Sequence, residues 1–222
     1  MSDFFQPPPP EPREERDEWE PPLWLSPPRG VLPGTVALNV VLARTKSAAV
    51  CLSRVDAYPA GLTFDIIQLL SSDADEDVLD ILDGRQMRRI RDRADEGELP
   101  PELLRLGVEF ADGSKVTNIA SGVPGSGSWT KMVSGLKTDG EADVPDGPVL
   151  NSTGGSGSSR YQQQSYWLWP LPQAGELTFV CEWPAVGLPL TRRSFDAAVF
   201  LAAAAEAQVV FEDPGSPGLV LK

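Results

Sequence analysis

The sequence contains no histidine and only two cysteines, and these absences exclude several classes of active site. Ser-His-Asp and Cys-His catalysis are excluded because each needs an imidazole as the proton carrier. Zinc sites that contain histidine are excluded as well, and two cysteines cannot complete a four-cysteine site. Any catalysis would depend on Lys, Tyr, Asp or Glu as the proton carrier. The sequence therefore favours a protein that is not an enzyme, and it gives no indication of a bound cofactor or metal.

A long hydrophobic run and a leader pattern are also missing. No stretch reaches the run of about 20 apolar residues that crosses a bilayer, and the first residues lack the basic and apolar regions of a signal peptide. The net charge of −13 disfavours nucleic acid and anionic membrane surfaces as partners. We therefore expect a soluble, cytoplasmic protein in which Cys51 and Cys181 are buried thiols rather than a disulfide.

Residues 1–28 predict a disordered, acidic tail with polyproline character. They carry nine prolines and seven acidic residues, too little apolar surface to offset the entropy of ordering. Within this tail lies an apolar cluster that is unusual for a solvated segment: Trp19, Leu23, Trp24 and Leu25. Two interpretations stay open for this cluster. It either folds back on the protein's own domain or docks on a protein partner.

Residues 29–213 predict a single β-rich domain, followed by a short tail over 214–222. Apolar and polar residues alternate with period two, most clearly in 62–70 and 176–183, as in half-buried strands. Pro59 with Gly61, and Asp112 with Gly113, are typical of the turns that join such strands. The complete set of predicted strands is 35–42, 49–57, 62–70, 103–110, 115–119, 161–171, 176–183 and 208–211.

Three segments interrupt the strands. Residues 72–98 predict a charged helical insertion, because acidic residues precede the arginines as the helix dipole favours. Residues 120–158 predict a flexible loop rich in glycine and serine. Residues 196–207 contain seven alanines and predict a short buried helix capped by Ser194. The fold class is therefore mainly β, an antiparallel β-sandwich, with a half-open β-barrel as the alternative.

Several strings of residues carry a resemblance to other proteins. They are Leu-Gly-Val-Glu-Phe-Ala-Asp-Gly from residue 106, Tyr-Trp-Leu-Trp-Pro-Leu-Pro from 166 and Leu-Thr-Phe-Val-Cys-Glu-Trp-Pro from 177. Together with the proline-rich acidic start and the Gly/Ser loop, they resemble a group of uncharacterised actinobacterial proteins. The excess of arginine over lysine, 14 to 5, fits such a source. The resemblance covers about residues 30–211 and implies a common fold but no activity.

The aromatic pair Trp167 and Trp169 is the main candidate for a ligand site, since both side chains share one face of the predicted strand. Such rings stack on sugars or peptides. They can equally fill a sandwich core together with Trp183. A third candidate is Ser128 with Lys131, whose S-x-x-K spacing occurs in some hydrolases but falls here in a flexible loop.

The leading functional hypothesis is a non-catalytic protein–protein interaction module whose acidic, aromatic tail docks on a partner or masks the domain itself. Trp19, Leu23, Trp24 and Leu25 are the docking residues of this hypothesis. The alternative is a β-sandwich that binds a small carbohydrate or peptide ligand on Trp167 and Trp169. A hydrolase using Ser128 is the remote alternative.

Overall fold

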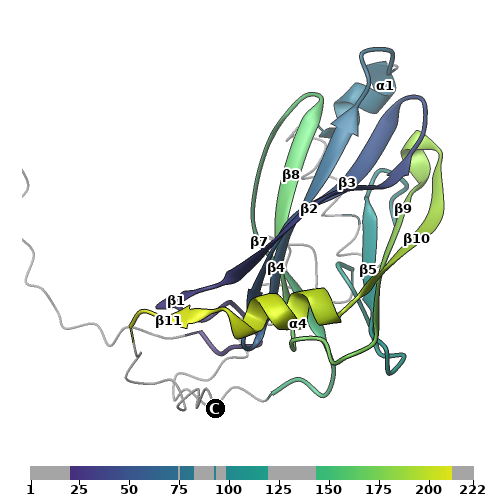
Figure 1. Ribbon diagram of the computed structural model, residues 1–222. Coiled ribbons are helices and arrows are strands. Elements are labelled where there is room, and N and C mark those ends of the chain that lie inside the picture. The colour runs from purple at the N-terminus through teal and green to yellow at the C-terminus, as the bar shows by residue number, and fades with distance from the viewer. Residues whose placement is uncertain (1–20, 75, 83–92, 94–98, 120–143, 212–222) are drawn as a thin grey trace, which may run out of the picture.

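Two antiparallel sheets face each other in the structure, a computed structural model that describes residues 21–74, 76–82, 93, 99–119 and 144–211 (Figure 1). The five-stranded sheet has the order β2-β3-β4-β8-β7, and the four-stranded sheet has the order β10-β9-β5-β6. A separate ladder pairs β1 with β11. The mainly β, antiparallel sandwich predicted from the sequence is confirmed, in preference to the half-open barrel.

The strands of the five-stranded sheet are β2 (Gly34–Arg44), β3 (Ala48–Tyr58), β4 (Gly61–Leu70), β7 (Val149–Ser158) and β8 (Tyr161–Trp169). Those of the four-stranded sheet are β5 (Arg105–Glu109), β6 (Lys115–Thr117), β9 (Glu176–Trp183) and β10 (Leu188–Asp196). The remaining elements are β1 (Val31–Leu32), β11 (Gln208–Val209), the helices α1 (Glu76–Leu79) and α4 (Ala198–Ala205), and the 3-10 turns η1 (Asp80–Leu82) and η2 (Pro184–Val186).

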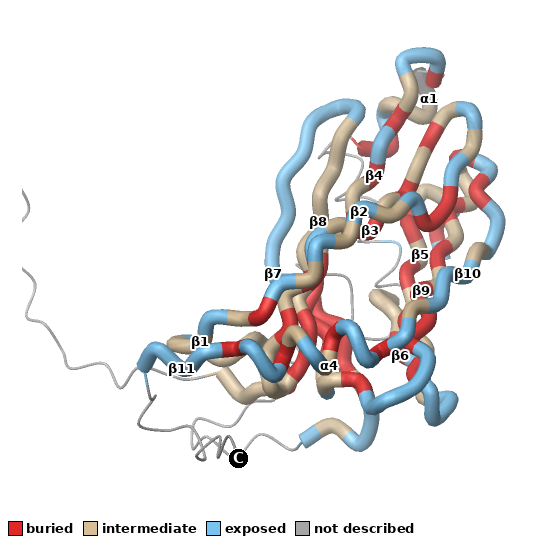
Figure 2. Tube along the Cα trace, in the orientation of Figure 1, coloured by how far each residue is buried: buried red, intermediate tan, exposed pale blue. Residues whose placement is uncertain are grey.

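The inner faces of the two sheets form one hydrophobic core, which Figure 2 shows as buried stretches along the facing strands. At its centre the rings of Phe64 from β4 and Phe179 from β9 meet edge to face, with centroids 5.1 Å apart. Trp183 is fully buried, and its indole nitrogen donates to the Glu102 carbonyl at 2.8 Å. Trp183 is therefore a core residue.

Cys51 and Cys181 are free thiols, Cys181 buried and Cys51 half-buried.

The turns predicted from glycine and proline join the strands as expected. Tyr58 pairs with Gly61 where β3 turns into β4, with Pro59 in the turn. The Asp112-Gly113 pair closes the hairpin between β5 and β6, and Gly113 has a φ of 85°. That hairpin has three loop residues rather than two, because the last ladder pair is Glu109 with Lys115 and the Phe110 N–H donates to the Ser114 carbonyl at 2.9 Å.

The predicted end of the Gly/Ser loop is wrong, since Val149–Ser158 forms the edge strand β7. Glycines and serines give no alternation of apolar and polar residues. The strand conformation of this segment therefore comes from its pairing with β8, and its own side chains contribute little to it. The edge strand β10 was not predicted either, because its exposed arginines and Pro189 hide the period-two pattern. Residues 120–143 of the predicted loop lie outside the described residues.

The predicted alanine-rich helix is present as α4, but it is not a buried helix, since only Phe200 and Ala204 of it are buried, and its cap differs. Ser194 lies in β10, where it bonds Thr178, so the predicted cap is wrong. The Asp196 carboxylate instead accepts from the Ala198 backbone N–H at 2.9 Å. The helix packs on β2 and β3, and its backbone at Ala203 lies where a side chain at Gly34 would sit. Small residues on both elements therefore permit this close contact.

Much of the predicted helical insertion lies outside the described residues. Of residues 72–98, the structure describes 72–74, 76–82 and Arg93, with α1 and η1 as the short helical turns. The tails over 1–20 and 212–222 also lie outside. Within the described part of the chain, no helix has the length and apolar character needed to cross a membrane.

Candidate functional site

The most unusual residue of the five-stranded sheet is Trp167, on β8. The residues on either side of it in the strand, Tyr166 and Leu168, point into the core. There they lie beside Phe64 and Leu62, their cross-strand neighbours on β4. Because side chains alternate along a strand, Trp167 must point to the outer face. An outer face of an antiparallel sheet is normally in contact with water, yet Trp167 is 0% exposed. Some other part of the chain must cover it.

The covering segment is residues 21–25, which we call the strap. The indole N–H of Trp167 donates to the Leu23 carbonyl at 2.9 Å. The side-chain amide of Asn151 donates to the carbonyls of Trp24 and Leu25 at 3.2 and 3.1 Å. A turn closes the strap, since the Leu25 N–H donates to the Pro22 carbonyl at 2.8 Å. Two side chains of the sheet therefore hold three consecutive carbonyls of the strap.

Four strands contribute to the shelf on which the strap lies. Asn151 of β7 is the direct cross-strand neighbour of Trp167 and is 1% exposed. Tyr58 of β3 packs edge to face against the Trp167 ring, with centroids 5.7 Å apart. Gly61 of β4 lies beneath this ring, where an added Cβ would come 2.7 Å from Trp167 Cη2. The missing side chain at Gly61 therefore lets the indole lie close to the sheet.

Two polar atoms, one in the strap and one in the shelf, are buried without a hydrogen-bond partner. Both Trp24 Nε1 and Asn151 Oδ1 are buried without a partner in the structure. Burial of an unpaired polar atom costs roughly 1–3 kcal/mol. Burial also raises the pKa of the Tyr58 hydroxyl above its usual value. The strap is thus recognised through its backbone, with an incomplete set of polar contacts.

The structure decides several interpretations that the sequence left open. Trp24 and Leu25, predicted as docking residues, are each 7% exposed and lie against the protein's own domain, while Leu23 is half-buried. Trp167, predicted as a stacking residue, is 0% exposed in the structure. Trp19 lies outside the described residues.

Two residues of the shelf were missed in the sequence. Asn151 follows two aliphatic residues at the start of a strand, and a lone amide in that position was the available signal. Gly61 was assigned only a turn, whereas its larger role is to make room for the Trp167 ring. Neither role follows without knowing that β7, β4 and β8 are neighbours.

Trp169, two residues further along β8, lines a hollow of about 510 Å³ at the end of the sandwich. The hollow lies between the β5–β6 hairpin, residues 145–148 and residues 169–174. Its aromatic and proline side chains are accompanied by Asp112, Ser114, Asp146 and Gln173. Trp169 is half-buried, so part of it remains open to solvent. Of the two tryptophans predicted to bind a ligand, this one retains an accessible surface.

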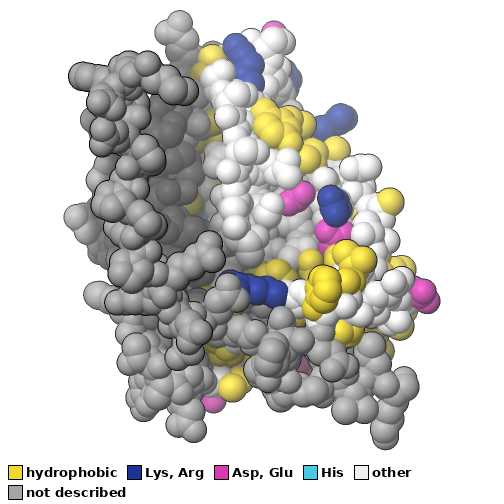
Figure 3. Space-filling model, turned by 90° about the vertical axis from the view of Figure 1, so that its left-hand side faces the viewer, with side chains coloured by type: hydrophobic (Ala, Val, Ile, Leu, Met, Phe, Trp, Pro, Cys, Tyr) yellow, Lys and Arg dark blue, Asp and Glu magenta, His cyan; other side chains and the backbone are white. Residues whose placement is uncertain are grey.

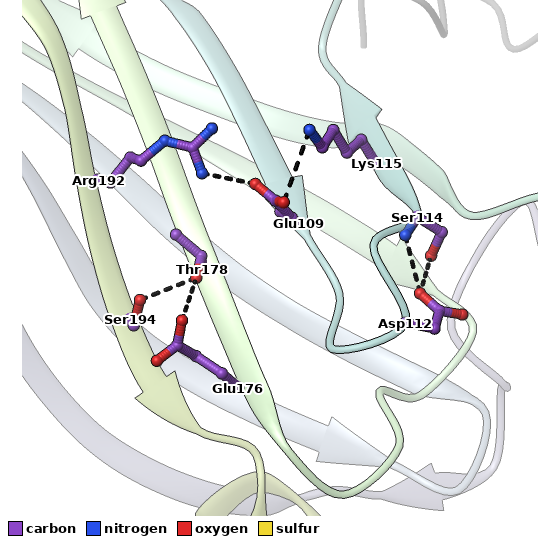
Figure 4. A network of polar contacts seen from close by, with 8 residues as sticks. All are labelled: Glu109, Asp112, Ser114, Lys115, Glu176, Thr178, Arg192 and Ser194. Atoms are coloured by element: carbon purple, nitrogen blue, oxygen red, sulfur yellow. Dashed lines mark hydrogen bonds and ion pairs between the residues drawn. The ribbon is translucent and has the colours of Figure 1, made fainter.

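The outer face of the four-stranded sheet carries a polar network instead (Figure 4). Glu109 accepts from Arg192 at 2.5 Å and lies 3.6 Å from the Lys115 amine. The hydrogen bond from Arg192 holds the pKa of the Glu109 carboxyl below its usual value. Thr178 and Ser194 share a hydrogen bond of 2.8 Å beside it. The charges on this face are thus compensated between neighbouring strands.

The opposite side of the molecule, where β7 and β8 lie, presents separate hydrophobic groups with acidic and basic side chains between them (Figure 3). On the outer face of the five-stranded sheet, Val41, Cys51 and Ile67 are cross-strand neighbours in one row. A polar row follows, in which Asp65 accepts from Gln163 at 2.8 Å and from Ser165 at 2.5 Å. The strap therefore covers one end of a mixed surface.

Ser128 and Lys131 lie outside the described residues, so their spacing stays a sequence pattern. In the parts of the chain that the structure describes, no group of three carboxylate or thiol side chains is arranged to hold a metal ion. Comparison of the chain with protein-family models, with curated protein sequences and with solved structures gives no match.

Proposed function

We propose that this protein is a non-catalytic protein–protein interaction module whose peptide-binding site is the shelf formed by Trp167 and Asn151. In this proposal the strap is an intramolecular ligand that masks the site. The observation that carries it is the complete burial of Trp167 on the outer face of a sheet, under a segment 144 residues away in sequence. The lack of histidine supports a role without catalysis.

The contacts are those of a peptide-recognition site. Donors from the sheet bind main-chain carbonyls, which every peptide has, while Trp24 and Leu25 supply buried side chains that distinguish one peptide from another. Main-chain hydrogen bonds combined with side-chain pockets are a recurring mode of peptide binding, and here the bound segment is a turn. A partner segment that combines proline with bulky apolar residues matches this site, as Pro-Pro-Leu-Trp-Leu of the strap does.

The strap is held weakly enough to exchange. Burial of two apolar side chains and formation of three hydrogen bonds contribute roughly 5–10 kcal/mol. Fixing the backbone of five residues costs a similar amount, roughly 5–10 kcal/mol. Because the strap is tethered, its effective concentration at the shelf is on the order of millimolar. A partner peptide therefore competes with the strap through affinity, and the shelf is masked when no such partner is present.

The proposal is tested in the full-length protein with a variant whose strap no longer occupies the shelf. Binding of a synthetic peptide with the strap sequence is then measured. The double variant Trp24→Ala, Leu25→Ala removes the side chains that the strap buries. A fluorescent synthetic peptide of residues 17–28 is then titrated with each protein and followed by anisotropy. We expect saturable binding to the variant, and binding at least tenfold weaker to the wild type, whose own strap competes.

The control adds Asn151→Ala to the double variant, which removes the donor to both carbonyls and should weaken peptide binding further. A peptide library displayed on phage then identifies the preferred sequence on the vacated protein. If neither the strap peptide nor any library sequence bound the vacated shelf, the strap would be a fixed structural part of the domain and the proposed function would be rejected.

A further inference from the structure

We propose that the hollow beside Trp169 is a binding site for a neutral oligosaccharide, a site distinct from the strap and independent of the peptide-binding proposal. Its volume of about 510 Å³ falls in the range of small-ligand sites. The walls come from three segments that are separate in sequence, with the β5–β6 hairpin on one side and the chain around Trp169 on the other. Such convergence of loops at the end of a sandwich is a usual place for a ligand site.

The lining chemistry excludes two classes of ligand. None of the lining residues is a lysine or an arginine, and two are aspartates, so an anionic ligand would meet only repulsion. A purely apolar ligand would cover carboxylates without giving them hydrogen bonds, which is costly. A sugar satisfies both halves of the lining, since its ring face packs on aromatic and proline surfaces and its hydroxyls bind carboxylate and amide groups.

The polar side of the hollow is preorganised. Asp112 Oδ1 accepts from the backbone N–H of Ser114 at 2.9 Å and from its hydroxyl at 2.6 Å. Both bonds from Ser114 go to this one oxygen of the carboxylate (Figure 4). The same hydrogen bonds from Ser114 lower the pKa of the Asp112 carboxyl below its usual value. The hairpin therefore presents an acceptor in a fixed position.

A cationic ligand is the competing occupant, because carboxylates and an aromatic ring also bind amines. The sugar is favoured for two reasons. Asp112 already uses one oxygen within its own turn, and exposed ion pairs contribute only about 0–1 kcal/mol. The side-chain amide of Gln173 also offers N–H donors, which a sugar hydroxyl can accept and a protonated amine cannot.

The test applies the full-length protein to a broad array of neutral oligosaccharides and follows the strongest binder by NMR of the tryptophan indole N–H groups. We expect saturable binding and a shift of the Trp169 signal. Trp169→Ala should weaken binding at least tenfold, while the matched control Phe211→Ala, an exposed aromatic outside the hollow, should leave it unchanged.

The double variant Asp112→Asn, Asp146→Asn gives a second readout if loss of the indole disturbs folding, and it should also weaken binding at least tenfold. Spermidine and arginine amide are titrated in parallel as cationic probes. No binder on the array, binding that survives both sets of substitutions, or binding of the amines alone would each overturn the proposal. These outcomes leave the strap experiment unaffected, because the two sites use different side chains.

Discussion

Replacement of Gly61 by alanine tests the packing beneath Trp167. An alanine Cβ at this position would lie 2.7 Å from Cη2 and 2.9 Å from Cζ2 of the indole, and it would also contact the Leu168 carbonyl oxygen. Overpacking of this kind costs typically 1–3 kcal/mol, and the cost is at the upper end when the neighbour is backbone in a paired strand. The change from glycine itself returns about 0.5–1 kcal/mol by reducing the entropy of the unfolded chain. We therefore expect Gly61→Ala to lower the free energy of unfolding by about 2 kcal/mol.

The matched control is Gly154→Ala, a glycine of β7 in the same sheet whose added Cβ meets nothing within 4 Å. Because only the unfolded-chain effect acts at this open position, this control should raise the free energy of unfolding by about 0.5–1 kcal/mol. Urea unfolding followed by circular dichroism and tryptophan fluorescence gives both values, and for a domain of this size about 2 kcal/mol corresponds to a melting temperature lowered by about 4–8 °C. A Gly61→Ala protein as stable as the wild type would refute the argument that this glycine makes room for the indole.

Four further predictions concern single groups. Asn151→Ala should destabilise the closed strap by about 1–3 kcal/mol and speed hydrogen exchange in residues 21–28, whereas unchanged exchange would contradict the role of this amide. Burial raises the pKa of Cys181 from 9.0 to about 11, so the folded protein should lose stability as the pH rises from about 9 to 11, and Cys181→Ala should flatten that slope in urea titrations. At neutral pH a thiol reagent should label Cys51 well before Cys181. The carboxyl of Glu109 should titrate at higher pH in Arg192→Ala than in the wild type when followed by NMR, and equal titration would show that the ion pair is absent in solution.

The sequence predicts those strands whose side chains meet both a core and water. The β3–β4 hairpin and β9 follow from alternation and from turn residues, since those local features and the final fold agree. The strand β7 does not follow, because its residues are mostly glycine and serine and its strand conformation comes from pairing with β8. The residue pattern of one segment does not show that the segment pairs with a strand elsewhere in the chain.

The candidate site shows the same division. The apolar cluster of the strap and the tryptophans of β8 were both visible in the sequence as residues that needed an explanation. That Leu23 meets Trp167 across 144 positions of the chain was not visible, because it depends on which strand lies beside which. The face to which Trp167 points follows from alternation, but its burial follows only from the strap.

The ladder between β1 and β11 has a mechanical consequence. Val31 pairs with Val209 and Leu32 with Gln208, so the chain enters β1 and leaves β11 at the same end of one antiparallel ladder. A force pulling on the two sides of the chain would load these few hydrogen bonds one after another, as a zipper opens, rather than all together in shear. The helix α4, which directly precedes β11 in the chain, lies against β2 at Gly34. Traction from the C-terminal side would therefore open this corner of the domain first, whereas traction from the N-terminal side would first load the contacts of the strap.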